Sequence, residues 1–253
     1  VVIGTLDPNP KVSGRGVKIL QDAGVEVIVG ILTNECNELN KRFFTFQRHK
    51  RPYILLKWAQ TNDGFIDRIR INSNQQPLQI SNRYSQQLTH KMRSENQAIL
   101  VSTNTVVLDN PTLNVRFWSG KSPIRLTLDR TGRIPATHTI FDGNYPTVVF
   151  THIEKKNTHN VQYKQLDFEN KCIENLLNKL FEMQIHSVLV EGGAKLLSSF
   201  IEENYWDEAH VEVADMLVGV GIKAPKLPIL PLSTEKLDDR VLYKFSNSNA
   251  TQA

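Results

Sequence analysis

One stretch of the sequence, residues 187–202, constrains the fold more than any other. It begins with a short apolar run, residues 188–190, of the kind found in buried parallel strands. Glu191-Gly192-Gly193 interrupts this run, and from Ala194 onward apolar residues recur at helical spacing. The stretch therefore predicts a strand, a tight glycine turn and a helix.

The glycine turn is also a candidate binding site. It leaves unpaired N–H groups at the helix start, where these donors and the helix dipole favour a phosphate or pyrophosphate. Glu191, at the mouth of the turn, could hold a sugar hydroxyl or position a proton. An equally good interpretation is that the two glycines only permit a close connection between strand and helix.

Length and composition are those of an ordinary globular protein. The 253 residues are 40% hydrophobic and 22% charged, which suits one large domain or one domain plus a fragment. No apolar run approaches the roughly 18 to 20 residues of a membrane span, so no membrane association is expected. Val1 opens an apolar run with no basic segment before it, which is not typical of a signal peptide. We expect a fragment of a longer protein.

The net charge of +4 suits an anionic small molecule as well as nucleic acid. Nucleic acid is the weaker interpretation, because no arginine-rich run, helix-turn-helix pattern or RNA-binding aromatic signature is present. Cys36 and Cys172 have no metal-ligand neighbours at zinc-site spacing, so no metal site is expected. Isolated cysteines also favour a reduced, cytoplasmic protein.

From residue 53 onward, predicted strands alternate with predicted helices, and the last strands follow without helices. This order predicts an α/β fold with a mainly parallel sheet, helices on both faces and antiparallel strands added last. Residues 1–46 are predicted as strand–helix–strand–helix scaffold, with the second helix at 35–46. Residues 49–52 are predicted as a linker and residues 65–79 as a flexible loop beside a site.

Four features suggest chemistry. Lys57 lies in an apolar strand, where a lysine is costly unless its ammonium reaches a cleft, a partner or the surface. Residues 102–105 are small and polar, and they follow a strand end, where open α/β sheets place ligands. Arg116 suits a phosphate because a guanidinium can bind two oxygens at once. Arg93 ends a helix, where it could equally complement the helix dipole.

Three ordered motifs resemble the reductase domain of the riboflavin pathway, which forms the C-terminal part of the bifunctional deaminase/reductase (RibD) family. The resemblance covers about residues 50–246. The motifs are Tyr53-Ile54-Leu55-Leu56-Lys57-Trp58-Ala59 with Asp63-Gly64; Ala98-Ile99-Leu100-Val101 leading to Thr105 and on through Asp109-Asn110-Pro111 to Arg116; and Val190-Glu191-Gly192-Gly193 with Leu196-Leu197 and Asp207-Glu208.

The leading piece resembles the end of the zinc deaminase domain that precedes this reductase. The similar residues are Asp7-Pro8-Asn9-Pro10, Gly14-x-Gly16 and Ala23-Gly24-Val25. The family's HxE and PCxxC zinc motifs are absent from this sequence, so zinc would belong only to a longer parent. We expect residues 1–48 to be a remnant of a cytidine-deaminase-like α/β domain and residues 49–253 to be the reductase domain.

The resemblance implies a dihydrofolate-reductase-like fold and a cytoplasmic homodimer. It also implies a phosphorylated ribosylaminopyrimidine substrate. The reaction would be NADPH-dependent reduction of the ribosyl group of 5-amino-6-(5-phosphoribosylamino)uracil to a ribityl group. Two alternatives stay open: a reductase of the undeaminated diaminopyrimidine or a pterin, and a catalytically silent nucleotide-binding module. The deaminase remnant favours deamination before reduction.

The resemblance also assigns site residues. Lys57, Asp109 and Glu191 would be catalytic, and any of the three could donate or relay the proton. The substrate would contact Arg93, Leu113, Arg116 and Glu191. NADPH would contact Ala59, Thr105, Asp109, Gly192, Gly193, Ala194, Lys195, Leu196, Leu197, Ser198 and Ser199. The chain departs from the family pattern at Pro77, Gln79 and Arg130.

Overall fold

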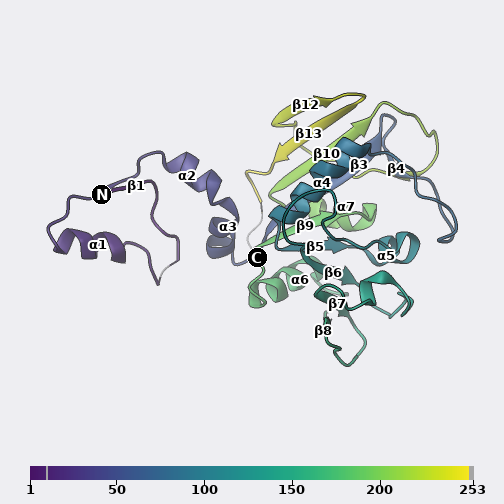
Figure 1. Ribbon diagram of the computed structural model, residues 1–253, viewed down its shortest axis with the longest axis horizontal. Coiled ribbons are helices and arrows are strands. Elements are labelled where there is room, and N and C mark those ends of the chain that lie inside the picture. Colours follow the sequence, from purple (N-terminus) through teal and green to yellow (C-terminus); the bar gives the residue numbers. More distant parts are fainter. Residues whose placement is uncertain (10, 251–253) are drawn as a thin grey trace.

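The computed structural model describes residues 1–9 and 11–250, so Pro10 of the expected Asp7–Pro10 turn and the last residues of the 49–253 segment lie outside the described residues. A nine-stranded sheet forms the centre of the molecule (Figure 1). Its strands are β3 (Tyr53–Thr61), β5 (Ala98–Val101), β6 (Ile124–Leu128), β7 (Thr147–Thr151), β8 (Val161–Gln165), β9 (Ser187–Glu191), β10 (Glu208–Ala214), β12 (Ser233–Leu237) and β13 (Arg240–Ser246).

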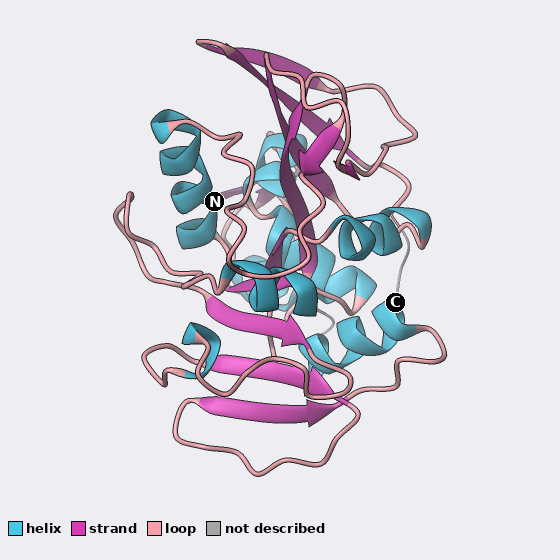
Figure 2. Cartoon of the chain, turned by 90° about the vertical axis from the view of Figure 1, so that its right-hand side faces the viewer, coloured by secondary structure: helices cyan, strands magenta, loops and turns pink. Residues whose placement is uncertain are grey.

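The sheet has the strand order β12-β13-β10-β3-β9-β5-β6-β7-β8. Every neighbouring pair from β10 to β8 is parallel, whereas β13 pairs antiparallel with both β10 and β12. Figure 2 shows the twist of the sheet between the long C-terminal strands at the top and the strands at the bottom. The predicted mainly parallel sheet with antiparallel C-terminal strands is therefore confirmed.

Helices cover both faces of the sheet. On one face, Leu55 of β3 and Leu189 of β9 pack against Met92 of α4 (Arg83–Glu95). On the same face, Ile99 of β5 packs with Val106 of α5 (Thr103–Asp109), and the short helix η1 (Thr139–Phe141) joins this cluster. The opposite face packs against α6 (Cys172–Glu182) and α7 (Ala194–Glu202). Alternation of side chains along each strand thus supplies both cores.

The organising stretch folds as predicted. Residues 188–190 of β9 are 0% exposed, because this central strand is covered on both faces. After the glycine turn, α7 buries Leu196, Leu197 and Phe200 in the core.

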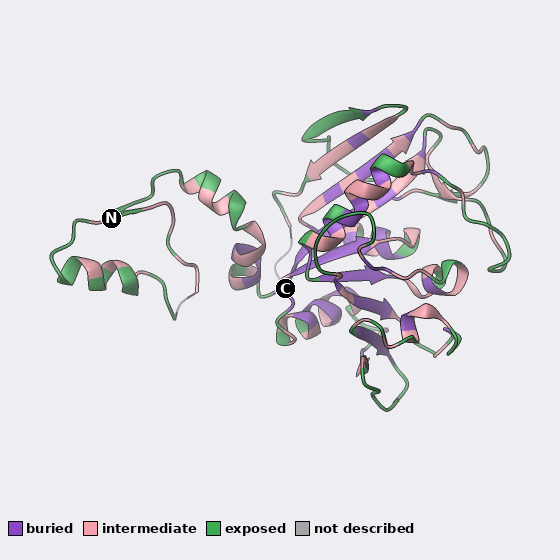
Figure 3. Ribbon diagram, in the orientation of Figure 1, coloured by how far each residue is buried: buried purple, intermediate pink, exposed green. Residues whose placement is uncertain are grey.

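The N-terminal piece lies to one side of the sheet and is largely exposed (Figures 1 and 3). Its strands β1 (Val2–Ile3) and β2 (Ile28–Val29) form a separate two-stranded parallel sheet. Its helices are α1 (Arg15–Asp22), α2 (Thr33–Leu39) and α3 (Lys41–His49). Only α3 among them contains buried residues, and its Phe46 packs on the rings of Phe181 and His186. The domain boundary after residue 48 stays a prediction.

Two local predictions were wrong. The helix expected at 35–46 is broken at Asn40, whose side chain donates to the carbonyl of Cys36 and competes with the helix. The loop expected at 65–79 begins with β4 (Phe65–Asp67), which pairs with β11 (Ile222–Lys223). The expected linker at 49–52 connects α3 to β3 and is buried at Arg51, whose guanidinium lies 2.7 Å and 2.9 Å from the two oxygens of Asp207.

Helix α5 was not predicted at all. Its residues are rich in threonine and valine, which are weak helix formers. The helix starts where Ser102 caps it, with the Ser102 Oγ accepting from the Thr105 N–H at 3.3 Å.

Leu197→Ala should lower the free energy of unfolding by about 2–5 kcal/mol, because this α7 side chain is fully buried. Leu230, which is 89% exposed, provides the matched control, and Leu230→Ala should cost less than about 0.5 kcal/mol. Urea unfolding followed by circular dichroism measures both. A loss below about 1 kcal/mol for Leu197→Ala would contradict its place in the core.

Candidate active site

A cavity of about 990 Å³ opens at the carboxyl ends of the central parallel strands. β3 contributes Lys57 and Ala59, the end of β5 contributes Val101 and Ser102, and the end of β9 contributes Glu191. The starts of α5 and α7 and the loop around residues 66–81 complete its wall. This is the edge of an open α/β sheet where ligands bind.

The glycine turn is packed directly on the start of α5. Gly192 and Gly193 have φ values of +98° and +83°, a region that side chains rarely adopt. A Cβ at Gly193 would lie 2.4 Å from the Oγ of Ser102, and one at Gly192 would lie 3.4 Å from the Oγ1 of Thr105. The glycines are therefore required for the close strand–helix connection, which also brings two helix starts to one wall of the cavity.

Glu191 is held by Arg93 in a two-pronged ion pair. Arg93 Nε lies 2.8 Å from Oε1 of Glu191, and Nη2 lies 2.6 Å from Oε2. Burial raises the pKa of Glu191, but the charge and hydrogen bonds of Arg93, and then the charge of Lys57, outweigh it and hold the pKa below its ordinary value. Glu191 is therefore ionised at neutral pH, which favours it as an acceptor of hydrogen bonds over a proton donor.

Asp109, at the end of α5, has the opposite tendency. Its carboxylate lies 2.5 Å from Nη2 of Arg70, an arginine of the loop that also donates to Asp67. Burial raises the pKa of Asp109 above its ordinary value, and the charge and hydrogen bond of Arg70 offset this only in part. Asp109 therefore takes up a proton more readily than an ordinary aspartate does.

Lys57 points its side chain to the same face of the sheet as Leu55 and Glu191. The side chain is 12% exposed, and its Nζ lies 4.0 Å from Oε2 of Glu212 on the neighbouring strand β10. Lys57 thus has both features that make a lysine in an apolar strand tolerable: its ammonium reaches a cleft, and a carboxylate there compensates its charge.

Most of the predicted site residues line this one cavity. They are Lys57, Ala59, Arg93, Thr105, Asp109, Leu113, Glu191, Gly192, Gly193, Ala194, Lys195, Leu196 and Ser199. Pro77 and Gln79, which depart from the family pattern, line it as well.

Leu197, Ser198 and Arg116 are not among the described residues that line the cavity. Leu197 is 0% exposed and faces the core, because it lies on the buried side of α7 together with Phe200. Its assignment to the cofactor site stays a prediction. Arg116 is exposed, and its guanidinium donates to Oδ1 of Asn114 at 2.8 Å and stacks over Phe117. Arg93, unlike Arg116, lines the cavity, and its ion pair with Glu191 gives it a role beyond complementing a helix dipole.

Several lining residues were missed from the sequence. Arg70 and Ser81 lie in or beside the segment expected to be a flexible loop, and nothing local marks them as partners of Asp109 and Glu212. Arg133 also lines the cavity, where it donates to Oδ1 of Asn104 at 2.8 Å. Its place in a turn directly after a strand was a usable signal.

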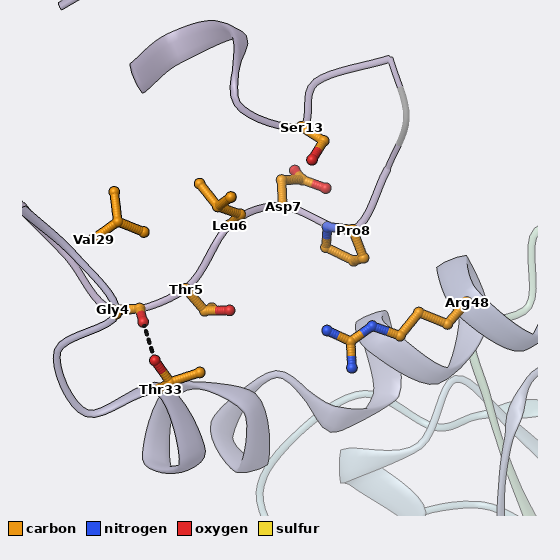
Figure 4. Close-up of a pocket in the computed structure, with 10 residues that line it drawn as sticks. Gly4, Thr5, Leu6, Asp7, Pro8, Ser13, Val29, Thr33 and Arg48 are labelled. Atoms are coloured by element: carbon orange, nitrogen blue, oxygen red, sulfur yellow. Dashed lines mark hydrogen bonds between the residues drawn. The ribbon is translucent and has the colours of Figure 1, made fainter. Parts of the chain in front are cut away.

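A second, smaller cavity of about 480 Å³ lies within the N-terminal piece, between the segment around residues 4–8 and Arg48 of α3. Figure 4 shows the side chain of Arg48 extending from α3 toward Thr5, while Thr33 donates to the carbonyl of Gly4 at 2.9 Å. Its described lining contains none of the predicted catalytic or binding residues. The larger cavity is therefore the candidate active site.

Residues 1–9 and 11–250 offer neither a clustered metal site nor a membrane-spanning helix. They contain no group of three or more His, Cys, Asp or Glu residues that could hold a metal ion. Within the same residues, every helix is too short or too polar to cross a membrane.

The model of the RibD C-terminal domain family matches residues 52–248, the part of the chain that forms the sheet and the cavity. The chain belongs to this family. The predicted resemblance is thereby confirmed, and the match begins within the buried Arg51-Pro52 connection.

Named relatives extend the RibD match beyond this domain. The riboflavin biosynthesis protein RibD of Aquifex aeolicus is 38% identical over 234 residues, which cover 90% of this chain and 65% of that protein. RibD of Actinobacillus pleuropneumoniae is 36% identical over 258 residues, which cover 98% of this chain and 67% of that protein. The chain thus spans about two thirds of the length of these relatives.

A solved structure agrees. The diaminohydroxyphosphoribosylaminopyrimidine deaminase/5-amino-6-(5-phosphoribosylamino)uracil reductase of Thermotoga maritima superposes with a TM-score of 0.82 at 33% identity, covering 97% of this chain and 70% of that one. The RibD reductase fold expected for this chain is therefore confirmed.

Arg93→Ala should destabilise the protein by about 3–5 kcal/mol, because it leaves the buried carboxylate of Glu191 without its partner. Lys91→Ala is the matched control on the same helix, since Lys91 forms an exposed pair with Glu95 and should cost less than about 1 kcal/mol. Thermal unfolding compares the two variants. Equal, small losses would contradict a buried Arg93–Glu191 pair.

Proposed function

We propose that this chain catalyses NADPH-dependent reduction of the ribosyl group of 5-amino-6-(5-phosphoribosylamino)uracil to a ribityl group. The proposal depends on one observation above all: a glycine turn, a lysine and two differently tuned carboxylates meet in a single cavity. The name of the Thermotoga maritima relative, which includes a 5-amino-6-(5-phosphoribosylamino)uracil reductase, supports it.

The residues around the glycine turn fit the cofactor. Because neither glycine carries a Cβ, a pyrophosphate could approach the backbone at the start of α7, where no side chain among the described residues caps the helix. The cofactor would contact Ala59, Thr105, Asp109 and the lining residues of the turn and α7. When bound, NADPH would supply the hydride for the reduction.

The remaining chemistry falls to the protein. As the ribosylamine opens, the ring oxygen of the ribose must gain a proton. Lys57 is suited to hold or donate that proton, because its ammonium lies at the cavity wall beside an anionic partner. Asp109 is the second candidate donor, since burial raises the pKa of its carboxyl. Glu191, kept ionised by Arg93, is suited to accept hydrogen bonds from sugar hydroxyls.

Substrate contacts follow from the same geometry. Arg93 and Leu113 line the cavity and remain proposed substrate contacts. The phosphate contact proposed for Arg116 requires its guanidinium to leave Asn114 and turn toward the cavity. We also retain the homodimer as a proposal, with the antiparallel strands β12 and β13 as the expected interface.

The first test measures NADPH oxidation, which is monitored as the loss of absorbance of the reduced nicotinamide. The chain should oxidise NADPH in the presence of the deaminated ribosylaminouracil phosphate. NADH, the undeaminated diaminopyrimidine and a pterin should give little or no oxidation.

The controls separate the alternatives. Oxidation with the undeaminated compound or the pterin would assign the chain to a different reductase. NADPH binding without oxidation of any substrate, both in this chain and in a full-length parent, would show a silent module and contradict the proposal.

Gly193→Ala should weaken NADPH binding by about tenfold or more, because the new methyl group would meet Ser102 and the residue would be strained at positive φ. Gly143→Ala is the matched control: its φ is +73°, and no atom lies within 4 Å of the added Cβ. Calorimetric titration gives both dissociation constants. If both variants bind NADPH equally well, the turn does not cradle the cofactor.

A further inference from the structure

A buried carboxylate outside the predicted site lies behind Lys57. Glu212 is on β10, the strand that pairs in parallel with β3, and it lies opposite Ala59 in the register. Its side chain is only 2% exposed, and its Oε2 lies 4.0 Å from Nζ of Lys57. This is the ion pair that the described residues provide for Lys57.

Glu212 is held in place from a second side. Its Oε2 accepts a hydrogen bond of 2.6 Å from Oγ of Ser81, a residue that itself lines the cavity. A carboxylate with this degree of burial is retained only when nearby charges and donors compensate its lost hydration. Two cavity residues, Lys57 and Ser81, therefore meet at one buried carboxylate.

A second cation, Arg240, also pairs with Glu212 but directs its hydrogen bonds to another group. Arg240 Nε lies 3.1 Å from Oε1 of Glu212, yet its N–H is directed at the carbonyl of Ile80, to which Nη2 also donates. In the described part of the chain, Oε1 of Glu212 consequently has no hydrogen bond. Arg240 contributes charge to Glu212 but does not saturate its oxygens.

Glu191, the other carboxylate near Lys57, is held by a different partner. Although it lies opposite Lys57 in the register of β3 and β9, both of its oxygens are bound by Arg93. Glu191 contributes charge to Lys57 from β9, whereas Glu212 on β10 is the carboxylate that lies within 4.0 Å of the Lys57 Nζ.

We propose that Glu212 is a positioning residue for Lys57: it holds the ammonium at the cavity wall, in reach of the reacting sugar. This inference rests on the proposed reductase function. The contact of 4.0 Å is long for a direct hydrogen bond, so Lys57 is restrained by charge and remains free to turn toward a substrate oxygen. Ser81 sets the orientation of the carboxylate and thereby of Lys57.

Steady-state kinetics test the catalytic part. Glu212→Gln keeps the size of the side chain but removes its charge, and kcat should fall about tenfold while the KM for NADPH changes less than about twofold. Glu212→Asp restores the charge and should recover kcat to within about threefold of the wild type. Glu235→Gln is the matched control, because Glu235 pairs with Lys244 on the exposed surface of the same sheet; it should leave kcat unchanged.

Two kinetic results would contradict the proposed role of Glu212. An unchanged kcat in Glu212→Gln, or a fall in kcat that Glu212→Asp does not recover, would overturn the positioning role. If the wild type itself fails to oxidise NADPH, the proposed function fails separately, and the coupling between Glu212 and Lys57 is then tested by stability.

For that second measurement, Lys57→Met, Glu212→Gln and the double variant are compared by thermal unfolding. Each single change should lower Tm, and the double variant should lose less than the sum, because it removes both members of the Lys57–Glu212 pair. Additive losses would overturn the pairing. If the double variant does not fold, Glu212 is needed for the stability of the sheet and for its ion pair with Arg240, and the positioning role is overturned.

Discussion

The contact between the glycine turn and the start of α5 is the constraint on which the site depends. A side chain at Gly193 would collide with Ser102, so β9 can end against α5 only if that position lacks a Cβ. The contact brings the carboxyl end of the central strand and the starts of two helices to one point. The register of β3 and β9 already sets Lys57 opposite Glu191, and the contact adds the starts of α5 and α7 to the same cavity wall.

The charges of the site are then paired across elements that are distant in sequence. Arg93 of α4 binds Glu191 of β9, Lys57 of β3 faces Glu212 of β10, and Arg70 of the loop binds Asp109 of α5. Each cation and its carboxylate come from different elements, so the protonation states of the site depend on the assembled fold. Burial raises the pKa of both Glu191 and Asp109. The pairing with Arg93 outweighs this effect at Glu191, whereas Arg70 offsets it only in part at Asp109.

Local patterns in the sequence predicted most of the fold. Buried strands such as 98–101 and 188–190 are continuous apolar runs, and the 3.6-residue periodicity of α6 and α7 is strong. Helix α5 escaped notice because its threonines and valines are poor helix formers, and its start depends on a cap at Ser102. The sequence motifs predicted most residues that line the cavity. The ion-pair partners Glu212 and Arg70 are brought to the site by tertiary packing, and no local sequence pattern marks them. The direction of the Arg116 side chain is likewise set by its neighbour Asn114.

The strand order has a consequence for how the chain folds during synthesis. β3 is the first strand of the large sheet to leave the ribosome, yet its two neighbours are β9 and β10, which begin at residues 187 and 208. At about 5–20 residues per second, β3 waits several seconds or longer for a partner while its apolar edge is open to other chains. The sheet therefore has a high contact order, and its centre is completed only after residues 187–214 have been synthesised.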